Sequence, residues 1–497
     1  MCGICGVWGD DDTDAVQHMM RLQRQRGPDA EGEYVSDTGR LGHNRLSIMD
    51  VEGGNQPLFS EDRTRAIIAN GEIYNHAALR ADLEYRHSFA TDSDTEVVVH
   101  LYEDEGTGTA EMLDGMFAFA IADGDDIYLA RDPVGIKPLY YGKRSGSTIF
   151  ASELKALAGV AENVREFPPG HWFHSQSGFH QYYDVPNLDP LKSSDEEHAA
   201  RVRQVLERSV VKRLMSDVPL GSFLSGGLDS SAAASIASRH IDGLNTFAVG
   251  IEGSRDLEAA RVAAKFIGSK HHEYLVTKKE VASCLPEIVY SLESFDMDLV
   301  RSAVPCYFAS RLAAEYVKVI FTGEGADELF AGYTYQKDIT DEDALRAELR
   351  RSIQGLHNTN LQRVDRLTMA HGIEARVPFL DVKMIEEAQK VPARLKLRDG
   401  IEKWVLRKAC EDLLPSAILW RKKEQFDEGS GLAEVLPEIT KLWVKPDEVV
   451  AYREASPGVR LRSHEECAYH KLLVDAYPEN EAILVNVAHW SDRPELG

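Results

Sequence analysis

The sequence predicts an α/β protein of two domains, the second of them built on a parallel sheet. The chain has 497 residues, too many for one ordinary domain. From about residue 200 onward, short apolar runs alternate with helical patterns. Such alternation is typical of parallel strands joined by right-handed helical crossovers. The first 180 residues differ, because they carry a series of polar motifs suited to holding an amino acid.

Composition excludes several classes of function. With 43% apolar and 28% charged residues the chain resembles a globular protein, and its apolar runs are too short to span a membrane. A net charge of −25 argues against nucleic-acid or membrane partners. Six scattered cysteines predict reduced thiols and a cytoplasmic location, and no secretory signal precedes the first motif. Cys2 and Cys5 have a zinc-like spacing, but no second pair completes a metal site.

The second residue of the chain, Cys2, is a candidate nucleophile. Removal of Met1 would leave a thiol and a free α-amine on one residue. An α-amine titrates at about 7.7–8.0, so its neutral form can accept the thiol proton. The thiolate is the reactive form. Position 2 alone is equally compatible with an unstructured terminus, so the interpretation depends on the motifs that follow.

These motifs could hold an amino-acid substrate. Arg45 carries the guanidinium suited to binding a carboxylate at two points. A strand over residues 66–69 leads into Asn70 and Gly71, whose amides could stabilise an oxyanion, although Asn-Gly is more often a turn. Residues 91–96 have the composition of a helix N-cap, and one of their acids could instead bind a substrate ammonium.

Taken in order, the motifs resemble the class II, N-terminal-nucleophile glutamine amidotransferases. The runs Met-Cys-Gly-Ile, Arg-Gly-Pro-Asp, His-x-Arg-Leu-Ser, Asn-Gly-Glu-Ile-Tyr-Asn and Ser-Asp-x-Glu follow that family's order over about residues 2–183. The resemblance implies an N-terminal nucleophile αββα sandwich with Cys2 as the nucleophile. It also implies an oxyanion hole and a glutamine site formed by Arg45, Asn70, Gly71, Glu72 and Asp94.

A linker is expected at about residues 184–200. Two prolines there are followed by small and charged residues, which is typical of connections between domains. We therefore expect a glutaminase domain over residues 2–185 and a second domain over residues 200–497.

The second domain begins with a regular series of elements. Apolar residues at helical spacing predict a helix near residues 202–214. Strands are expected over residues 219–224, 246–251 and 272–276, and helices over residues 232–239 and 256–267, the last ended by Gly268. Ligands bind at the carboxyl ends of such strands. The polar runs at 225–231 and 322–325 fall there.

The loop Ser225-Gly226-Gly227-Leu228-Asp229-Ser230-Ser231 is a candidate phosphate site. Glycines let the backbone approach an anion, and the amides of the following helix point toward it. Asp229 would repel a bare phosphate, so a bridging Mg²⁺ is expected. A plain glycine turn is the alternative.

The run Ser-Gly-Gly-x-Asp-Ser resembles the pyrophosphatase-loop synthetases, and residues 200–425 resemble the asparagine synthetase family. The matching runs are at 216–219, 246–250, 322–328, 374–381 and 422–426. The resemblance implies that Asp229 and Asp327 bind Mg²⁺, that Glu324 deprotonates ammonia, and that Lys423 stabilises phosphate charge. It implies an ATP site formed by Phe223, Leu224, Ser225, Gly226, Gly227, Asp229, Ser230, Val249, Thr322 and Gly323.

The implied reaction is ATP- and Mg²⁺-dependent amidation of aspartate with ammonia from glutamine. It proceeds through a Cys2 thioester and a β-aspartyl-adenylate and releases AMP and pyrophosphate. Glutamine, aspartate and ATP are the expected partners, and the resemblance leaves a homodimer open. Ala303 and Val304 replace a more polar pair near the family's acceptor site, so amidation of another carboxylate is the alternative. A silent scaffold conflicts with the joint presence of Cys2, Asp229, Glu324 and Lys423.

Overall fold

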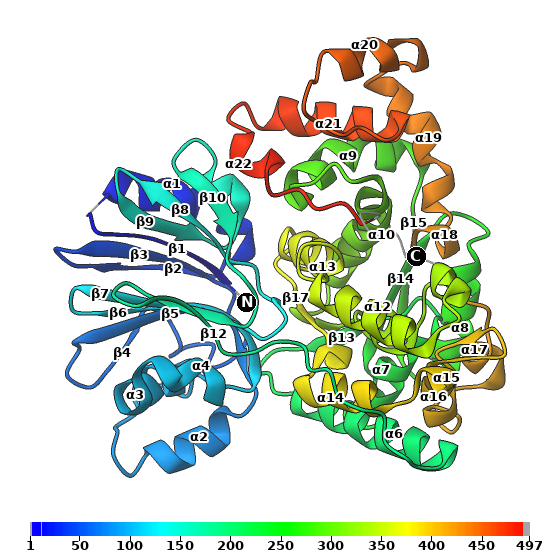
Figure 1. Ribbon diagram of the computed structural model, residues 1–497, viewed down its shortest axis with the longest axis horizontal. Helices are drawn as coiled ribbons and strands as arrows, with labels where there is room; N and C mark the ends of the chain where they lie inside the picture. Colours follow the sequence, from blue (N-terminus) through cyan, green and yellow to red (C-terminus); the bar gives the residue numbers. More distant parts are fainter. Residues whose placement is uncertain (1, 11, 425, 491–497) are drawn as a thin grey trace.

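The computed structural model describes residues 2–10, 12–424 and 426–490. Two six-stranded antiparallel sheets form the N-terminal half and lie face to face (Figure 1). One has the order β10-β8-β9-β1-β3-β2 and the other β12-β11-β7-β6-β5-β4. The first contains β1 (Cys2–Trp8), β2 (Ala30–Val35), β3 (Gly39–Arg45), β8 (Tyr140–Arg144), β9 (Ser147–Ala151) and β10 (Glu162–Glu166). The second contains β4 (Leu58–Phe59), β5 (Arg65–Ile73), β6 (Gly115–Asp123), β7 (Asp126–Arg131), β11 (His171–His174) and β12 (Gly178–Gln181).

Helices cover the outer faces of both sheets, which gives the four layers of an αββα sandwich and confirms the predicted fold of this half. Helix α1 (Thr13–Leu22) contacts β1 and β3, and α3 (Glu96–Glu105) contacts β4 and β5. Strand β6 shows how the sequence builds the layers, since alternate residues of a strand face opposite sides. Between the sheets pack its alanines, Ala118, Ala120 and Ala122. In the hydrophobic cluster that includes α3 pack its larger residues, Phe117, Phe119 and Ile121. The remaining helices are α2 (His76–Leu83), α4 (Thr109–Met112) and α5 (Leu154–Leu157).

The C-terminal half is built around a five-stranded parallel sheet with the order β15-β14-β13-β16-β17, as expected for this half. Helices α7 and α8 contact strands β13 to β16, while α10 contacts β14 and β15 and α13 contacts β17. The strands are β13 (Leu220–Phe223), β14 (Asn245–Gly250), β15 (Lys270–Leu275), β16 (Val319–Phe321) and β17 (Glu374–Arg376). A small hairpin adds β18 (Leu397–Arg398) and β19 (Ile401–Glu402).

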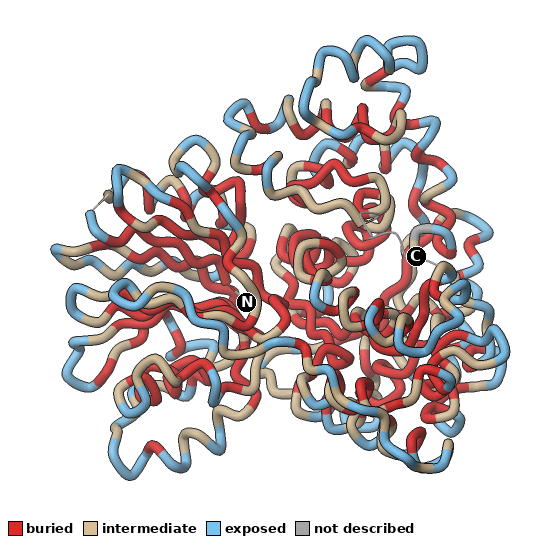
Figure 2. Tube along the Cα trace, in the orientation of Figure 1, coloured by how far each residue is buried: buried red, intermediate tan, exposed pale blue. Residues whose placement is uncertain are grey.

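The helices of this half account for most of its mass. They are α6 (Asp195–Lys212), α7 (Leu228–Ser238), α8 (Arg255–Ile267), α9 (Lys278–Leu292), α10 (Met297–Ala313), α11 (Ala326–Phe330), α12 (Glu342–Gln354), α13 (Asn360–Met369), α14 (Val382–Lys390), α15 (Ala393–Lys396), α16 (Trp404–Ala409), α17 (Ser416–Leu419), α18 (Phe426–Gly429), α19 (Leu436–Ile439), α20 (Val449–Glu454), α21 (His464–Ala476) and α22 (Glu481–Leu484). None of the helices in the described ranges combines the length and apolar composition that a bilayer-spanning segment needs. Figure 2 shows buried chain running through the sheets of both halves and along their contact.

Three differences from the expected elements affect the sites or the domain boundary, while the expected strands of the parallel sheet end within two residues of the observed ones. Strand β5 passes straight through Asn70 and Gly71, which pair with Ala118 and Phe117 of β6, so the turn interpretation is wrong. Helix α6 begins at Asp195, because Ser194 and Glu197 form a capping box inside the segment expected to be linker.

The third difference is at the phosphate-type loop. Helix α7 begins at Leu228 and not at 232, so Asp229 lies in its first turn. Elsewhere the end signal was correct: α8 stops at Gly268, which adopts a left-handed φ of 70°. The structure pairs none of the six cysteines with another.

Candidate active sites

The first candidate site lies where β1, β3 and β5 bring three predicted residues together. Cys2 is buried and pairs with Arg45 across the β1–β3 ladder. Its backbone N–H donates to Asn70 Oδ1 at 3.0 Å. Burial raises the pKa of the Cys2 thiol, and the nearby Arg45 partly opposes that shift. A base beside the thiol is therefore needed to generate the thiolate.

Asn70 has the property that an oxyanion donor needs. Its Nδ2 is buried and has no hydrogen-bond partner among the described residues. Leaving a buried donor unpaired costs about 1–3 kcal/mol, which is commonly tolerated where a ligand completes the contact. Gly71 follows with a φ of +151°, and a Cβ there would collide with the carbonyl oxygen of Met116. Only glycine therefore fits beside the Asn70 amide.

Arg45 takes a different conformation from the two-point grip expected. Its Nη1 donates to Val51 O at 3.0 Å and Asn55 Oδ1 at 2.8 Å. Its Nη2 donates to Met49 O at 3.0 Å and Asp50 O at 2.6 Å. These contacts use four of the five guanidinium N–H groups. Arg45 thus holds the loop at 49–55 against the site, and Nε–H is the donor left for a substrate.

Two carboxylates complete this site, and both have shifted pKa values. Asp94 Oδ2 accepts from Ile73 N at 2.7 Å, and burial raises the pKa of its carboxyl to about 6. Burial and the neighbouring carboxylates of Glu374 and Asp94 raise the pKa of Glu72. Arg376 Nη2 lies 3.6 Å from Glu72 Oε2. Glu374 and Arg376 come from β17, so the second half forms one wall of the first site, which sequence motifs did not reveal.

The second candidate site is a cavity of about 200 Å³ at the carboxyl ends of β13, β14 and β16. It brings together every expected ATP-binding residue except Gly226, and also Glu324, Asp327 and Lys423. Gly226 has a φ of 71° and packs against the backbone of Ala259, so its role is to let the loop turn. Lys422 and Glu424 also line the cavity, whereas Gln425 of the same motif lies outside the described residues.

Serine hydroxyls hold the phosphate-type loop closed. Ser225 N donates to Ser230 Oγ at 3.3 Å, and Gly227 N donates to Ser225 Oγ at 3.3 Å. The first amides of α7 follow directly, and helix N-terminal amides attract anions. The loop therefore offers backbone and hydroxyl donors to a phosphate group.

A lysine that the sequence motifs missed joins the two predicted metal-binding carboxylates. Lys403 Nζ lies 2.5 Å from Asp229 Oδ2 and 2.6 Å from Asp327 Oδ1. Lys423 Nζ lies 2.6 Å from Asp327 Oδ1. Burial opposes the charge on Asp327, but the two lysines outweigh it and lower the pKa of its carboxyl. None of the sequence motifs includes Lys403. The residue directly follows the short β18–β19 hairpin and has a left-handed φ of 55°.

These carboxylates suit a divalent cation. Asp229 Oδ1 is buried without a hydrogen-bond partner among the described residues, so it has a lone pair to offer. Hard cations such as Mg²⁺ bind one or two carboxylates together with phosphate oxygens. The residues present therefore fit a magnesium ion held between Asp229, Asp327 and a triphosphate.

The candidate base, Glu324, contacts a residue that sequence reasoning also missed. Its carboxylate accepts from Arg363 Nη2, and Arg363 lies on α13. Burial raises the pKa of Glu324, and Arg363 opposes that shift. A carboxylate whose pKa is raised by burial can take a proton from a reacting group more readily than an exposed carboxylate.

Ala303 and Val304 lie elsewhere than expected. Both are fully buried in the hydrophobic core, while α10 faces the cavity with Asp298, Leu299 and Ser302. The pair directly follows Ser302, which lines the cavity, so the replacement at 303–304 changes the packing behind the cavity wall.

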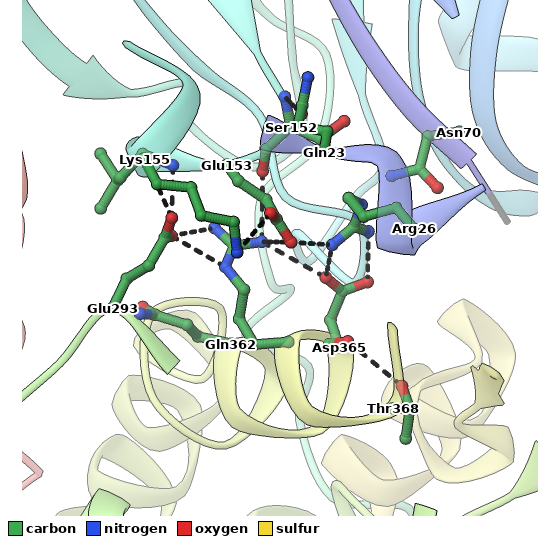
Figure 3. Close-up of polar contacts among 12 residues, drawn as sticks. Gln23, Arg26, Asn70, Ser152, Glu153, Lys155, Glu293, Gln362, Asp365 and Thr368 are labelled. Carbon is green, nitrogen blue, oxygen red and sulfur yellow. Dashed lines mark hydrogen bonds and ion pairs between the residues drawn. The ribbon is translucent and has the colours of Figure 1, made fainter. Parts of the chain in front are cut away.

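A buried cluster of charges joins the two halves between the sites (Figure 3). Arg26 Nη1 lies 2.8 Å from Glu153 Oε1 and 2.7 Å from Asp365 Oδ2. Arg366 Nη2 lies 2.9 Å from Glu293 Oε2, and the backbone N–H of Lys155 donates to Glu293 Oε1 at 2.7 Å. Helix α13 supplies Asp365 and Arg366 as well as Arg363, so one helix contacts both this cluster and the second site.

A buried cysteine near the N-terminus of an αββα sandwich, joined to a cavity beside a serine-glycine loop on a parallel sheet, is the arrangement of a glutamine amidotransferase coupled to an ATP-dependent synthetase. Comparison with known families agrees. Residues 1–171 match the glutamine amidotransferase domain, and residues 201–340 and 335–447 match asparagine synthase. The chain belongs to the glutamine-hydrolysing asparagine synthetase family, which uses ATP.

Three relatives show how far the likeness extends. The chain is 42% identical to asparagine synthetase [glutamine-hydrolyzing] 3 of Arabidopsis thaliana, over 87% of this chain and 79% of that protein. It is 41% identical to the corresponding protein of Brassica oleracea, over 97% of this chain and 88% of that protein. It is 37% identical to the probable asparagine synthetase of Dictyostelium discoideum, over 99% of this chain and 96% of that protein.

Proposed function

We propose that this chain makes asparagine from aspartate, taking the amide nitrogen from glutamine and using ATP and Mg²⁺. The observation that carries the proposal is the pairing of two complete sites on one chain. One has a buried thiol beside an unpaired amide donor, and the other has a serine-glycine loop beside two carboxylates and two lysines. Three relatives that match nearly the whole length support it.

In the first site, Cys2 attacks the side-chain amide of glutamine after Met1 has been removed. The free α-amine accepts the thiol proton, and the Asn70 Nδ2 and Gly71 N–H groups stabilise the oxyanion. Collapse of the tetrahedral intermediate gives a thioester and ammonia, and water then releases glutamate. Arg45 binds the substrate carboxylate. Asp94 and Glu72 face its ammonium.

In the second site, the aspartate β-carboxylate attacks the α-phosphorus of ATP and displaces pyrophosphate. Asp229 and Asp327 would hold Mg²⁺, which neutralises charge on the phosphates. Lys423 stabilises charge that develops on the transferring phosphate, and the loop at 225–230 holds the pyrophosphate. Glu324 takes a proton from ammonia as it attacks the acyl-adenylate. AMP leaves and asparagine forms.

We assign the glutaminase half to residues 2–185 and the synthetase half to residues 200–497, with a connection at about 184–200. The separate sheets and the two family matches support this division. A cytoplasmic location and a homodimer stay predictions.

The nucleotide products test the proposal most directly. The complete reaction with aspartate, glutamine, ATP and Mg²⁺ is followed by ³¹P NMR, with ¹⁵N-amide glutamine tracing the nitrogen. We expect AMP and pyrophosphate in equal amounts and label in the asparagine side chain. ADP and phosphate would overturn the adenylation step. Turnover of another carboxylic acid with aspartate left untouched would replace the acceptor.

A further inference from the structure

Four side chains of the types that can bind a metal lie together in the glutaminase half, beside the segment that carries Asp94. Glu61 lies between β4 and β5, and His87 follows α2. His100 and Glu103 are three residues apart on α3, so they share one face of that helix. One ligand atom from each lies within 4.8 Å of all the others.

The nitrogen–oxygen distances within this cluster match a tetrahedral metal shell. His87 Nδ1 lies 3.3 Å from Glu61 Oε1 and 3.5 Å from Glu103 Oε2. His100 Nδ1 lies 3.5 Å from Glu61 Oε2 and 3.0 Å from Glu103 Oε2. Ligands bonded to zinc at about 2.0–2.1 Å are separated by about 3.3 Å along a tetrahedral edge. Small side-chain rotations would therefore bring all four groups onto one ion.

Carboxylates also lie behind both imidazoles, and one of them forms a hydrogen bond. His87 Nε2 lies 3.2 Å from Asp104 Oδ1, whereas His100 Nε2 lies 3.6 Å from Glu96 Oε1 and has no hydrogen-bond partner among the described residues. A carboxylate behind a histidine keeps the proton on the far nitrogen, so the near nitrogen is free to bind a metal. Glu96 is itself held, since it accepts from Ala90 N at 2.6 Å and Thr91 N at 2.7 Å. Asp104 thus leaves His87 Nδ1 for the other ligands, and His100 Nδ1 already lies 3.0 Å from Glu103 Oε2.

We propose that Glu61, His87, His100 and Glu103 form a binding site for a divalent transition metal of the zinc class. Two imidazole nitrogens and two carboxylate oxygens suit Zn²⁺ better than Mg²⁺, which prefers oxygen ligands alone. Four protein ligands leave no open position, so the metal is structural and not catalytic. The Glu61 side chain is 35% exposed, which gives the ion a route from solvent.

The site has a mechanical consequence for the glutamine pocket. The segment from His87 to His100 contains Asp94, which contacts the backbone of Ile73 beside Asn70 and Gly71. A metal bound to both ends of this segment, and to Glu61, fixes the path of the chain on which Asp94 lies. This consequence rests on the proposed glutaminase site, whereas metal binding itself does not.

The alternative is an ion-pair cluster in which protonated histidines face the carboxylates. Four carboxylates lie around the two imidazoles: Glu61, Glu96, Glu103 and Asp104. Their negative charge could be balanced by protons on both imidazoles or by one divalent ion. The two interpretations predict different amounts of metal bound per chain, because only a metal site retains an ion through desalting.

Metal content of the full chain tests the proposal. The protein carries Cys2→Ala so that its thiol cannot bind the ion, and it is stripped with chelator, loaded with Zn²⁺ in excess Mg²⁺ and desalted. We expect about one zinc per chain by mass spectrometry of metals, and a tetrahedral visible spectrum with Co²⁺. His87→Gln in the same background should lose the bound zinc. His180→Gln, at an exposed histidine on β12 of the same half, is the matched control and should keep it.

Two further variants keep the test independent of folding defects. Glu61→Gln changes an exposed ligand and should also lose zinc. Asp104→Asn leaves the ligands in place and should weaken zinc binding about 10–100-fold. Equal zinc in the His87→Gln and His180→Gln proteins, or no zinc in the parent, would overturn the proposal. Each ligand variant is also made with Cys2 intact to measure glutamine hydrolysis. Loss of zinc in the Cys2→Ala protein, with glutamine hydrolysis kept by the same variant carrying Cys2, would support the site and leave the proposed function intact.

Discussion

Arg26 and Asp365 form a two-point ion pair between the halves of the protein. Nη1 lies 2.7 Å from Oδ2 and Nη2 lies 3.1 Å from Oδ1, with both side chains buried. The same guanidinium donates through Nε to the carbonyl oxygen of Cys2 at 3.1 Å. Asp365 is two residues from Arg363, which contacts Glu324. The pair therefore connects the backbone of the proposed nucleophile with the helix that contacts the synthetase cavity (Figure 3).

Asp365→Asn should destabilise the contact between the halves. Breaking a buried ion pair commonly costs about 3–5 kcal/mol, and Glu153 still compensates Arg26, so we expect a loss of at most about 3 kcal/mol in the free energy of unfolding. Denaturant unfolding of the full chain measures it. Asp184→Asn is the control: it breaks an ion pair with Arg350 in which both side chains are partly exposed, and such pairs are worth about 0–1 kcal/mol. Equal losses in the two variants would contradict this account.

Cys2→Ala should abolish asparagine formation from glutamine and spare formation from added ammonia, because only the first site uses the thiol. Parallel assays with the two nitrogen donors measure the split. If both activities fell together, the assignment of separate sites would be wrong.

Asp229→Asn and Asp327→Asn should each remove ATP-dependent synthesis and leave glutamine hydrolysis measurable. The two carboxylates face the loop that we assign to pyrophosphate, and the β17 wall of the glutaminase site does not include them. Pyrophosphate release and glutamate release are measured on the same samples. A variant with normal pyrophosphate release would exclude its residue from the metal site.

The pH profile of glutamine hydrolysis should show the titration of Asp94. Burial raises the pKa of this carboxyl to about 6, so it is ionised above that pH and protonated below it. Binding of a substrate ammonium needs the ionised form, so kcat/KM should fall as the pH drops below about 6. The α-amine of Cys2 already gives a slope of about one below about 7.7–8.0, and Asp94 should increase the slope to about two.

Asp94→Asn provides the check on that assignment. The variant should hydrolyse glutamine less efficiently at every pH and keep the slope of about one down to pH 5. A slope of two that survives in the variant would assign the acidic limb to another group.

Particular residues show what sequence reasoning could and could not propose. Cys2, Asn70 and Gly71 could be proposed as site residues because each belongs to a contiguous motif, and strand pairing brings these motifs together. Arg363 and Lys403 could not be identified from the sequence, because neither belongs to one of the motifs. Each forms an ion pair with a residue far along the chain. The same reason explains Glu374 and Arg376, which were noted as a run but assigned no part in the glutaminase site.

The expected turn at residues 70–71 was wrong for a related reason. Asn70 and Gly71 have the composition of a turn, yet nine consecutive pairs with β6 keep β5 extended through them. Long-range pairing supplies more hydrogen bonds than an isolated turn, so tertiary context overrides the local preference.

By itself the sequence determined the two-domain α/β class and the order of the motifs, and the resemblance of those motifs to known families led us to propose the nucleophile and the phosphate-type loop. Periodicity and motif spacing are properties of short stretches, which a chain carries without being folded. Only the tertiary structure decided that β17 forms a wall of the glutamine pocket and that Lys403 joins Asp229 to Asp327. It also decided that α13 contacts the second site directly and reaches the backbone of Cys2 through Arg26. Those contacts exist because charges that are buried on folding must find partners, and the partners are residues that the fold brings near.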